Sequence, residues 1–169
     1  MFERSSENPV LCLIVDYSYI HDIKFESNIN AAIDGGVDVV QLRDKDIPYE
    51  DFLLIGEKLK DIIDGKVLFA VNSNVMVAND LEADIIHLPE IADNVNIIKQ
   101  IYKEKFIVGK SVHSTHSAKN AVSEGVDYVT IGTIFDSNSK PGGLISGLDL
   151  IELTAQEIEI PILAMMLVI

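Results

Sequence analysis

The chain has 169 residues, of which 48% are apolar, enough to build one domain with a sizeable core but too few to suggest two. Its 27 acidic and 13 basic residues give a net charge of −14, which disfavours binding to nucleic acids and to anionic membranes. An anionic small molecule is still compatible with this charge, because a few cations gathered in one cleft can outweigh a diffuse charge that salt screens.

Neither the cysteine content nor the N-terminal region predicts export. The single cysteine, Cys12, cannot form an internal disulfide, and it lies in an apolar run where a small buried residue is expected. That run, residues 10–15, is far too short for a signal-peptide core or a membrane span. We therefore expect a cytoplasmic protein that does not bind a membrane.

Apolar, strand-like segments alternate with helical patterns along the whole chain. The predicted strands are residues 11–15, 37–42, 67–71, 83–88, 106–113, 126–131 and 160–164. The predicted helices are residues 28–33, 48–63, 75–79, 94–101, 114–125 and 148–157. Because no hairpin signal separates the strands, they are expected to be parallel and joined by right-handed crossovers.

Three of the predicted strands share a sequence repeat. The scheme small-Asp-apolar-apolar-polar-apolar occurs at residues 37–42, 83–88 and 126–131. Gln41, His87 and Thr130 occupy the same step of the repeat, so we expect them to point to the same side of a sheet. We predict an α/β fold of the TIM (β/α)₈ type, with these side chains in the barrel interior or at its mouth. A doubly wound open sheet has the same periodicity, although no Gly-x-Gly-x-x-Gly motif follows the first strand.

Polar and cationic side chains gather where the second predicted strand ends. Gln41, Arg43 and Lys45 follow at every second position, so an extended backbone directs them to one side. Such a cluster suits an anionic small molecule, whereas the alternative is an ordinary strand that leaves the core through a charged loop.

Five motifs, in the same order, resemble the thiamine phosphate synthase and TenI-like superfamily. They are residues 40–46 (VQLRDKD), Asn72, residues 108–114 (VGKSVHS), residues 132–135 (GTIF) with Lys140, and Gly147-Leu148. The resemblance implies a (β/α)₈ barrel whose site lies at the carboxyl ends of the strands and acts on a thiazole phosphate.

The superfamily contains two activities, and the resemblance implies that the residues at the metal-binding positions distinguish them. Its synthases join an aminopyrimidine pyrophosphate to a thiazole phosphate, using Mg²⁺ held by acidic residues after the third and fourth strands. Here those positions read Ser73 and, approximately, Ala92, with Asp93 adjacent. Leu88-Pro89 and residues 111–114 look like the TenI branch, which includes thiazole tautomerases. We therefore interpret the chain as a TenI-like thiazole tautomerase without a metal site or cofactor; Mg²⁺ would be needed only under the alternative, a thiamine phosphate synthase.

A tautomerase must remove a proton from carbon and return it elsewhere, and His113 is the predicted catalytic residue for that step. In this hypothesis Arg43 and Lys45 hold anionic groups, Gln41 orients the ring, and Lys140 closes over the ligand. The predicted substrate-binding residues are Gln41, Arg43, Lys45, Asn72, Thr130, Lys140 and Gly147.

The end of the sequence departs from the family. A barrel of this kind needs eight strands, and we expect residues 1–169 to form a single barrel domain that lacks the last β/α unit. Where the family has a phosphate-binding Gly-Gly turn, this chain has Met165-Met166. We expect impaired activity and a homo-oligomer that pairs through the open barrel edge. A catalytically inactive barrel remnant with a binding or regulatory role is a second alternative.

Overall fold

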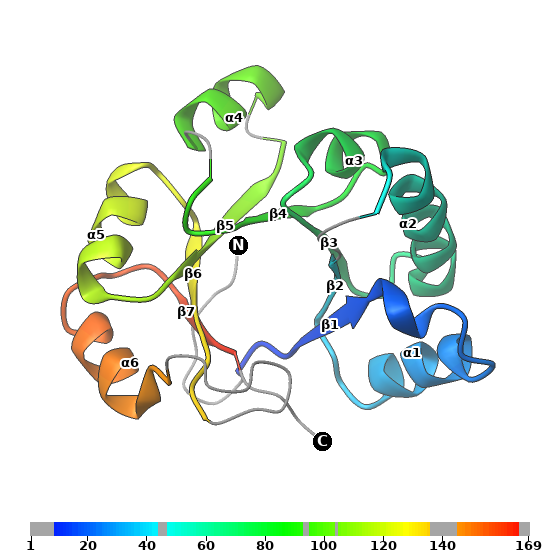
Figure 1. Cartoon of the computed structure of the whole chain (residues 1–169), viewed down its shortest axis with the longest axis horizontal. Helices are drawn as coiled ribbons and strands as arrows, with labels where there is room; N and C mark the ends of the chain where they lie inside the picture. Colours follow the sequence, from blue (N-terminus) through cyan, green and yellow to red (C-terminus); the bar gives the residue numbers. More distant parts are fainter. Residues whose placement is uncertain (1–8, 44–46, 93–94, 104, 136–144, 166–169) are drawn as a thin grey trace. The chain divides into compact units, whose positions relative to one another are not determined.

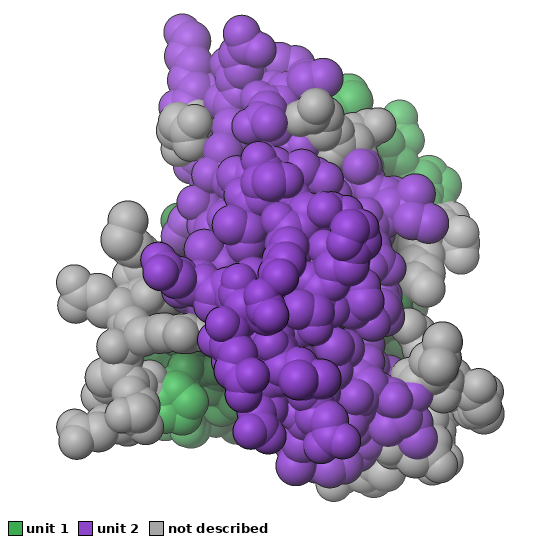
Figure 2. Space-filling model, turned by 90° about the vertical axis from the view of Figure 1, so that its left-hand side faces the viewer, with its two compact units in different colours: residues 1–87 green, residues 88–169 purple. Residues whose placement is uncertain are grey.

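Figure 1 shows the computed structural model, which describes residues 9–43, 47–92, 95–103, 105–135 and 145–165. The chain divides into two compact units, residues 1–87 and 88–169, which Figure 2 distinguishes by colour. Each unit is built from parallel strands that alternate with helices. In the described part of the chain, no helix is both long and apolar enough to cross a bilayer.

The first unit carries the strands β1 to β4, and the unit boundary falls at the end of β4. The strands are β1 (Cys12–Asp16), β2 (Val39–Arg43), β3 (Leu68–Asn72) and β4 (Ile85–Leu88). The helical segments are η1 (Tyr17–Tyr19), α1 (Phe25–Asp34), α2 (Tyr49–Ile63) and α3 (Val75–Asp80). Each strand pairs in parallel with the next strand in the chain. In Figure 1 the helices of this unit all lie on one side of its strands.

The second unit repeats the same alternation. Its strands are β5 (Ile107–Val112), β6 (Tyr128–Ile131) and β7 (Ile162–Ala164). Its helices are α4 (Val95–Tyr102), α5 (Thr115–Ser123) and α6 (Gly147–Ala155). The strand β6 pairs in parallel with both β5 and β7. The predicted parallel α/β organisation is therefore confirmed in both units.

The strands β2 and β4 are buried on both faces over most of their length, as continuous apolar runs predict. Every residue of β4 is buried, and so are the first four residues of β2. Gln41 and His87 are polar members of these runs, with only 6% and 4% of their surface exposed. Burial of polar side chains in this way requires hydrogen-bond partners, which the functional site supplies.

The repeated aspartates have a structural role that the repeat alone did not disclose. The Asp84 backbone N–H donates to the Phe69 carbonyl (3.0 Å), while its carboxylate accepts from the Phe69 N–H (2.8 Å). Asp38 makes the same pair of bonds with Leu11, at 2.9 and 2.8 Å. Asp127 makes it with Val108, at 2.7 Å for both bonds. Each aspartate thus ties the start of its strand to the preceding strand and sets the register of the pair.

The helix ends follow local chemistry. The helix α2 begins directly after Pro48 and ends at Ile63, and the following residue, Asp64, has a left-handed backbone conformation. Ser114 caps α5 by accepting from the Ser117 N–H at 3.0 Å. The helix α1 begins at Phe25, three residues before the predicted start, because Phe25 is buried and adds a packed turn.

Candidate functional site

The predicted site residues fall in both units, so the two groups are described separately. In the first unit a row of polar side chains crosses the strands. Gln41 on β2 donates from Nε2 to Oδ1 of Asn72 on β3, at 3.3 Å. The Cys12 thiol on β1 lies 4.0 Å from Gln41 Oε1. Asn72 stands opposite His87 in the β3–β4 register, and its amide donates to the Ser73 hydroxyl at 2.7 Å. Two predicted substrate-binding residues, Gln41 and Asn72, are thus in direct contact.

Arg43 lies next to this row, at the end of β2. Its guanidinium is 3.8 Å from the Asp16 carboxylate, and 31% of its side chain is exposed. A partly exposed pair of this length binds weakly, so Arg43 can turn toward an anionic ligand at little cost. The other predicted cations, Lys45 and Lys140, lie outside the described residues.

Burial keeps the rest of the row uncharged. Burial, together with the smaller effect of the nearby Arg43 cation, lowers the pKa of His87 to about 4. Burial likewise raises the pKa of the Cys12 thiol to about 11. Both groups are therefore neutral at pH 7, and they surround the Gln41–Asn72 pair with a low-dielectric environment in which hydrogen bonds are strengthened. Such a row suits a neutral polar ring, with Arg43 beside it for an anionic group.

In the second unit, His113 follows β5 and is held by a residue that the sequence analysis did not single out. The Glu90 carboxylate, in the turn after β4, lies 2.8 Å from His113 Nδ1 and also accepts from the His113 backbone N–H at 3.3 Å. The sequence held one signal that could have identified Glu90, because it is an acidic residue directly after Leu88-Pro89 at the end of a predicted strand. The carboxylate and the ring form a pair at the carboxyl ends of two strands, where the TIM fold places chemistry.

The remaining predicted residues of this unit lie on β6, at the start of α6 and directly after β7. Thr130 is half-buried on β6 and stands opposite Ser111 of β5. Gly147 starts α6 with a φ of +67°, a conformation that favours glycine. Met165 packs its side chain against Gly132, leaving no room for a Cβ there. Met166, the other member of the predicted Gly-Gly replacement, lies outside the described residues.

The described residues do not fit a Mg²⁺ site of the kind that the resemblance implies. Mg²⁺ prefers hard oxygen ligands, carboxylates above all. After β3, Ser73 and Asn74 offer neutral oxygens, and the Asn74 side chain already caps α3. After β4, Glu90 is engaged by His113. No group of three or more metal-binding side chains occurs among the described residues, and Asp93 lies outside them.

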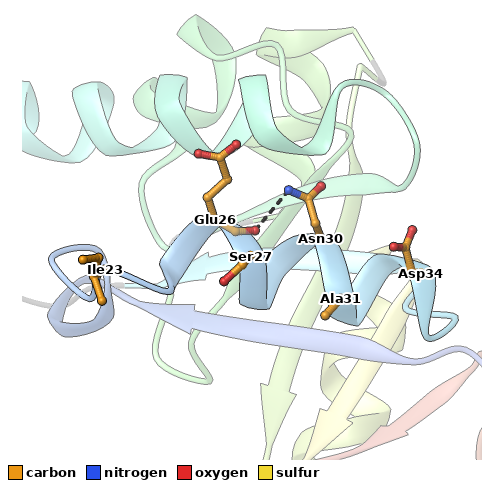
Figure 3. A pocket seen from close by; sticks show the side chains of 6 residues that line it. All are labelled: Ile23, Glu26, Ser27, Asn30, Ala31 and Asp34. Carbon is orange, nitrogen blue, oxygen red and sulfur yellow. Dashed lines mark hydrogen bonds between the residues drawn. The ribbon is translucent and has the colours of Figure 1, made fainter.

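An open hollow on the surface of α1 has the wrong chemistry for a phosphorylated ligand. Figure 3 shows its lining, which is Ile23, Glu26, Ser27, Asn30, Ala31 and Asp34. Two carboxylates face this hollow and its lining contains no cation, so an anionic ligand would be repelled. The strand ends are therefore the better candidate site.

Comparison with known proteins identifies the family. The model of the thiamine monophosphate synthase family matches residues 11–165. The chain belongs to this family. A thiamine-phosphate synthase of Coprothermobacter proteolyticus is 31% identical over 163 residues, which are 96% of this chain and 77% of that protein. One from Clostridium botulinum strain Hall is 32% identical over 159 residues, 93% of this chain and 78% of that protein.

A solved structure of a family member establishes the fold class. The thiamine phosphate pyrophosphorylase of Pyrococcus furiosus superposes with a TM-score of 0.78 at 24% identity, over 94% of this chain and 76% of that one. This confirms the predicted α/β fold of the TIM type and removes the doubly wound alternative.

The interpretation as a TenI-like thiazole tautomerase is wrong, because the similar proteins are named thiamine-phosphate synthases. The physical reason is that a histidine after a strand can serve either as a proton shuttle or as a hydrogen-bond donor to an anion. Residues 111–114 therefore could not distinguish the two activities of the superfamily.

Proposed function

We propose that the chain is a thiamine-phosphate synthase, which joins an aminopyrimidine pyrophosphate to a thiazole phosphate and releases pyrophosphate. The observation that carries this proposal is the 31% identity to a thiamine-phosphate synthase over 96% of the chain. The substrates are small and phosphorylated, which agrees with cationic side chains at strand ends in a strongly acidic protein.

The reaction breaks the bond between the pyrimidine methylene carbon and a pyrophosphate oxygen, and forms a bond from that carbon to the thiazole nitrogen. In this proposal the Gln41–Asn72 pair orients a ring by hydrogen bonds from the buried polar row. Arg43 offsets the charge of an anionic group, with Lys45 and Lys140 as further proposed cations. Thr130 on β6 and Gly147 at the start of α6 are also proposed to contact the substrate.

The test is an assay of the purified chain with both substrates, in which thiamine phosphate is separated and quantified. Arg43→Ala is expected to lower kcat/KM about 10- to 100-fold, the effect of removing one charge-assisted hydrogen bond. Lys66→Ala is the matched control, because Lys66 is an exposed cation outside the proposed site. A wild-type protein that binds neither substrate would contradict the proposal.

Two further expectations accompany it. A homo-oligomer is proposed on the exposed apolar side chains of Leu11 and Ile14, and analytical ultracentrifugation tests it. A cytoplasmic location is proposed on the single, unpaired cysteine, and cell fractionation tests it.

A further inference from the structure

The pair formed by Glu90 and His113 is built more specifically than a surface ion pair. Both carboxylate oxygens of Glu90 contact the same residue, one the His113 backbone N–H at 3.3 Å and the other the ring Nδ1 at 2.8 Å. The Ser117 hydroxyl also accepts from the His113 backbone N–H, at 3.2 Å. The histidine is thus held at its backbone and at its ring by groups from two different segments.

This arrangement fixes which ring nitrogen is available. Burial alone would raise the pKa of Glu90, but hydrogen bonds from Ser117 and His113 outweigh it and hold the pKa below its usual range. The carboxylate is therefore ionised and accepts, so Nδ1 carries a hydrogen. Half of the His113 side chain is exposed, and its Nε2 has no partner among the described residues.

The reaction needs a donor for the leaving group. When the carbon–oxygen bond breaks, its electron pair goes to pyrophosphate, whose oxygen gains negative charge. Among the described residues after β4, the Glu90 carboxylate is engaged by His113 and is not free to hold a cation beside it. A side chain that donates a hydrogen bond can stabilise part of that charge.

Resting on the proposed function, we infer that His113 donates a hydrogen bond from Nε2 to the departing pyrophosphate, and that Glu90 is the positioning residue that holds His113 for it. This donation requires a hydrogen on each ring nitrogen, with Nδ1–H on Glu90 and Nε2–H on a pyrophosphate oxygen. No proton moves to carbon in this step, and the positive charge left on the thiazole nitrogen balances the electron pair taken by pyrophosphate.

The experiment combines kinetics with calorimetric titration of inorganic pyrophosphate. His113→Ala is expected to weaken pyrophosphate binding and to lower kcat by about 10- to 100-fold each, since one charge-assisted hydrogen bond is lost. Glu90→Gln is expected to lower kcat by about tenfold while KM for the thiazole phosphate stays unchanged. In the double variant the two losses should not add, because Glu90 acts through His113.

His116→Ala is the matched control, because His116 is exposed on α5, the helix that follows His113, and bonds only to Asn120 among the described residues. Circular dichroism checks each fold, and His113→Gln replaces His113→Ala if the latter unfolds. Unchanged pyrophosphate binding in the folded His113 variant, or additive losses in the double variant, would overturn the inference. A wild-type protein that makes no thiamine phosphate contradicts the proposed function instead, and pyrophosphate binding by the variants still decides the role of His113.

Discussion

Removing one repeated aspartate should destabilise the protein by an amount that depends on where its partner N–H lies. In Asp84→Ala the Phe69 N–H, which is partly buried, loses a charged acceptor at 2.8 Å. A hydrogen bond to a charged group contributes about 1.5–3 kcal/mol, and an unsatisfied buried donor costs a similar amount. Because Asp84 itself is largely exposed, we expect the lower part of that range, about 2 kcal/mol.

The assay is urea unfolding followed by far-UV circular dichroism, with thermal unfolding as a second measurement. A loss of about 2 kcal/mol lowers the Tm of a chain of this size by about 4–8 °C. Asp84→Asn keeps an acceptor and should recover part of the loss.

Asp38→Ala is the matched comparison, because the Leu11 N–H that it releases is exposed and can bond to water. We expect less than about 1 kcal/mol there. Equal losses for Asp38→Ala and Asp84→Ala, or no loss for Asp84→Ala, would refute the view that these carboxylates stabilise the strand pairs by satisfying partly buried donors.

Three further predictions concern buried ionisable groups. The Cys12 thiol, with a pKa of about 11 against an ordinary 9.0, should react with iodoacetamide at pH 8 roughly 100-fold more slowly in the folded than in the urea-unfolded protein. The pKa of His87 is lowered from 6.5 to about 4 in the folded protein. Between these two pH values the unfolded chain therefore binds a proton at this histidine that the folded chain does not bind. Stability should therefore fall by up to about 3 kcal/mol as the pH drops from 6.5 to 4, and His87→Asn should flatten this part of the urea-derived profile. Glu124→Ala should lower the free energy of unfolding more than Lys110→Met does. In Glu124→Ala the Lys110 ammonium, which is 5% exposed, stays buried without its partner at 2.6 Å, whereas in Lys110→Met the Glu124 carboxylate still reaches water. Equal losses of unfolding free energy in urea would contradict this.

Much of the fold could be predicted from local pattern. Continuous apolar runs such as residues 11–15 are long enough for one strand only, and the helical segments between them left parallel strands as the consistent arrangement. The shared step of the repeat predicted that Gln41 and His87 lie in the barrel interior or at its mouth, and both side chains are buried. Function was the weaker inference, since the motif around His113 is compatible with both activities of the superfamily.

The sequence by itself determined which residues form strands and helices and which polar side chains lie at strand ends, because these depend on spacings of two to four residues. Only the tertiary structure decided which of those side chains meet. Glu90 and His113 are 23 residues apart, and Cys12 and Gln41 are 29 apart, so their contacts arise from strand pairing and helix packing rather than from any local period. The same holds for charge: the neutral state of His87 follows from burial among other strands, which no single segment encodes.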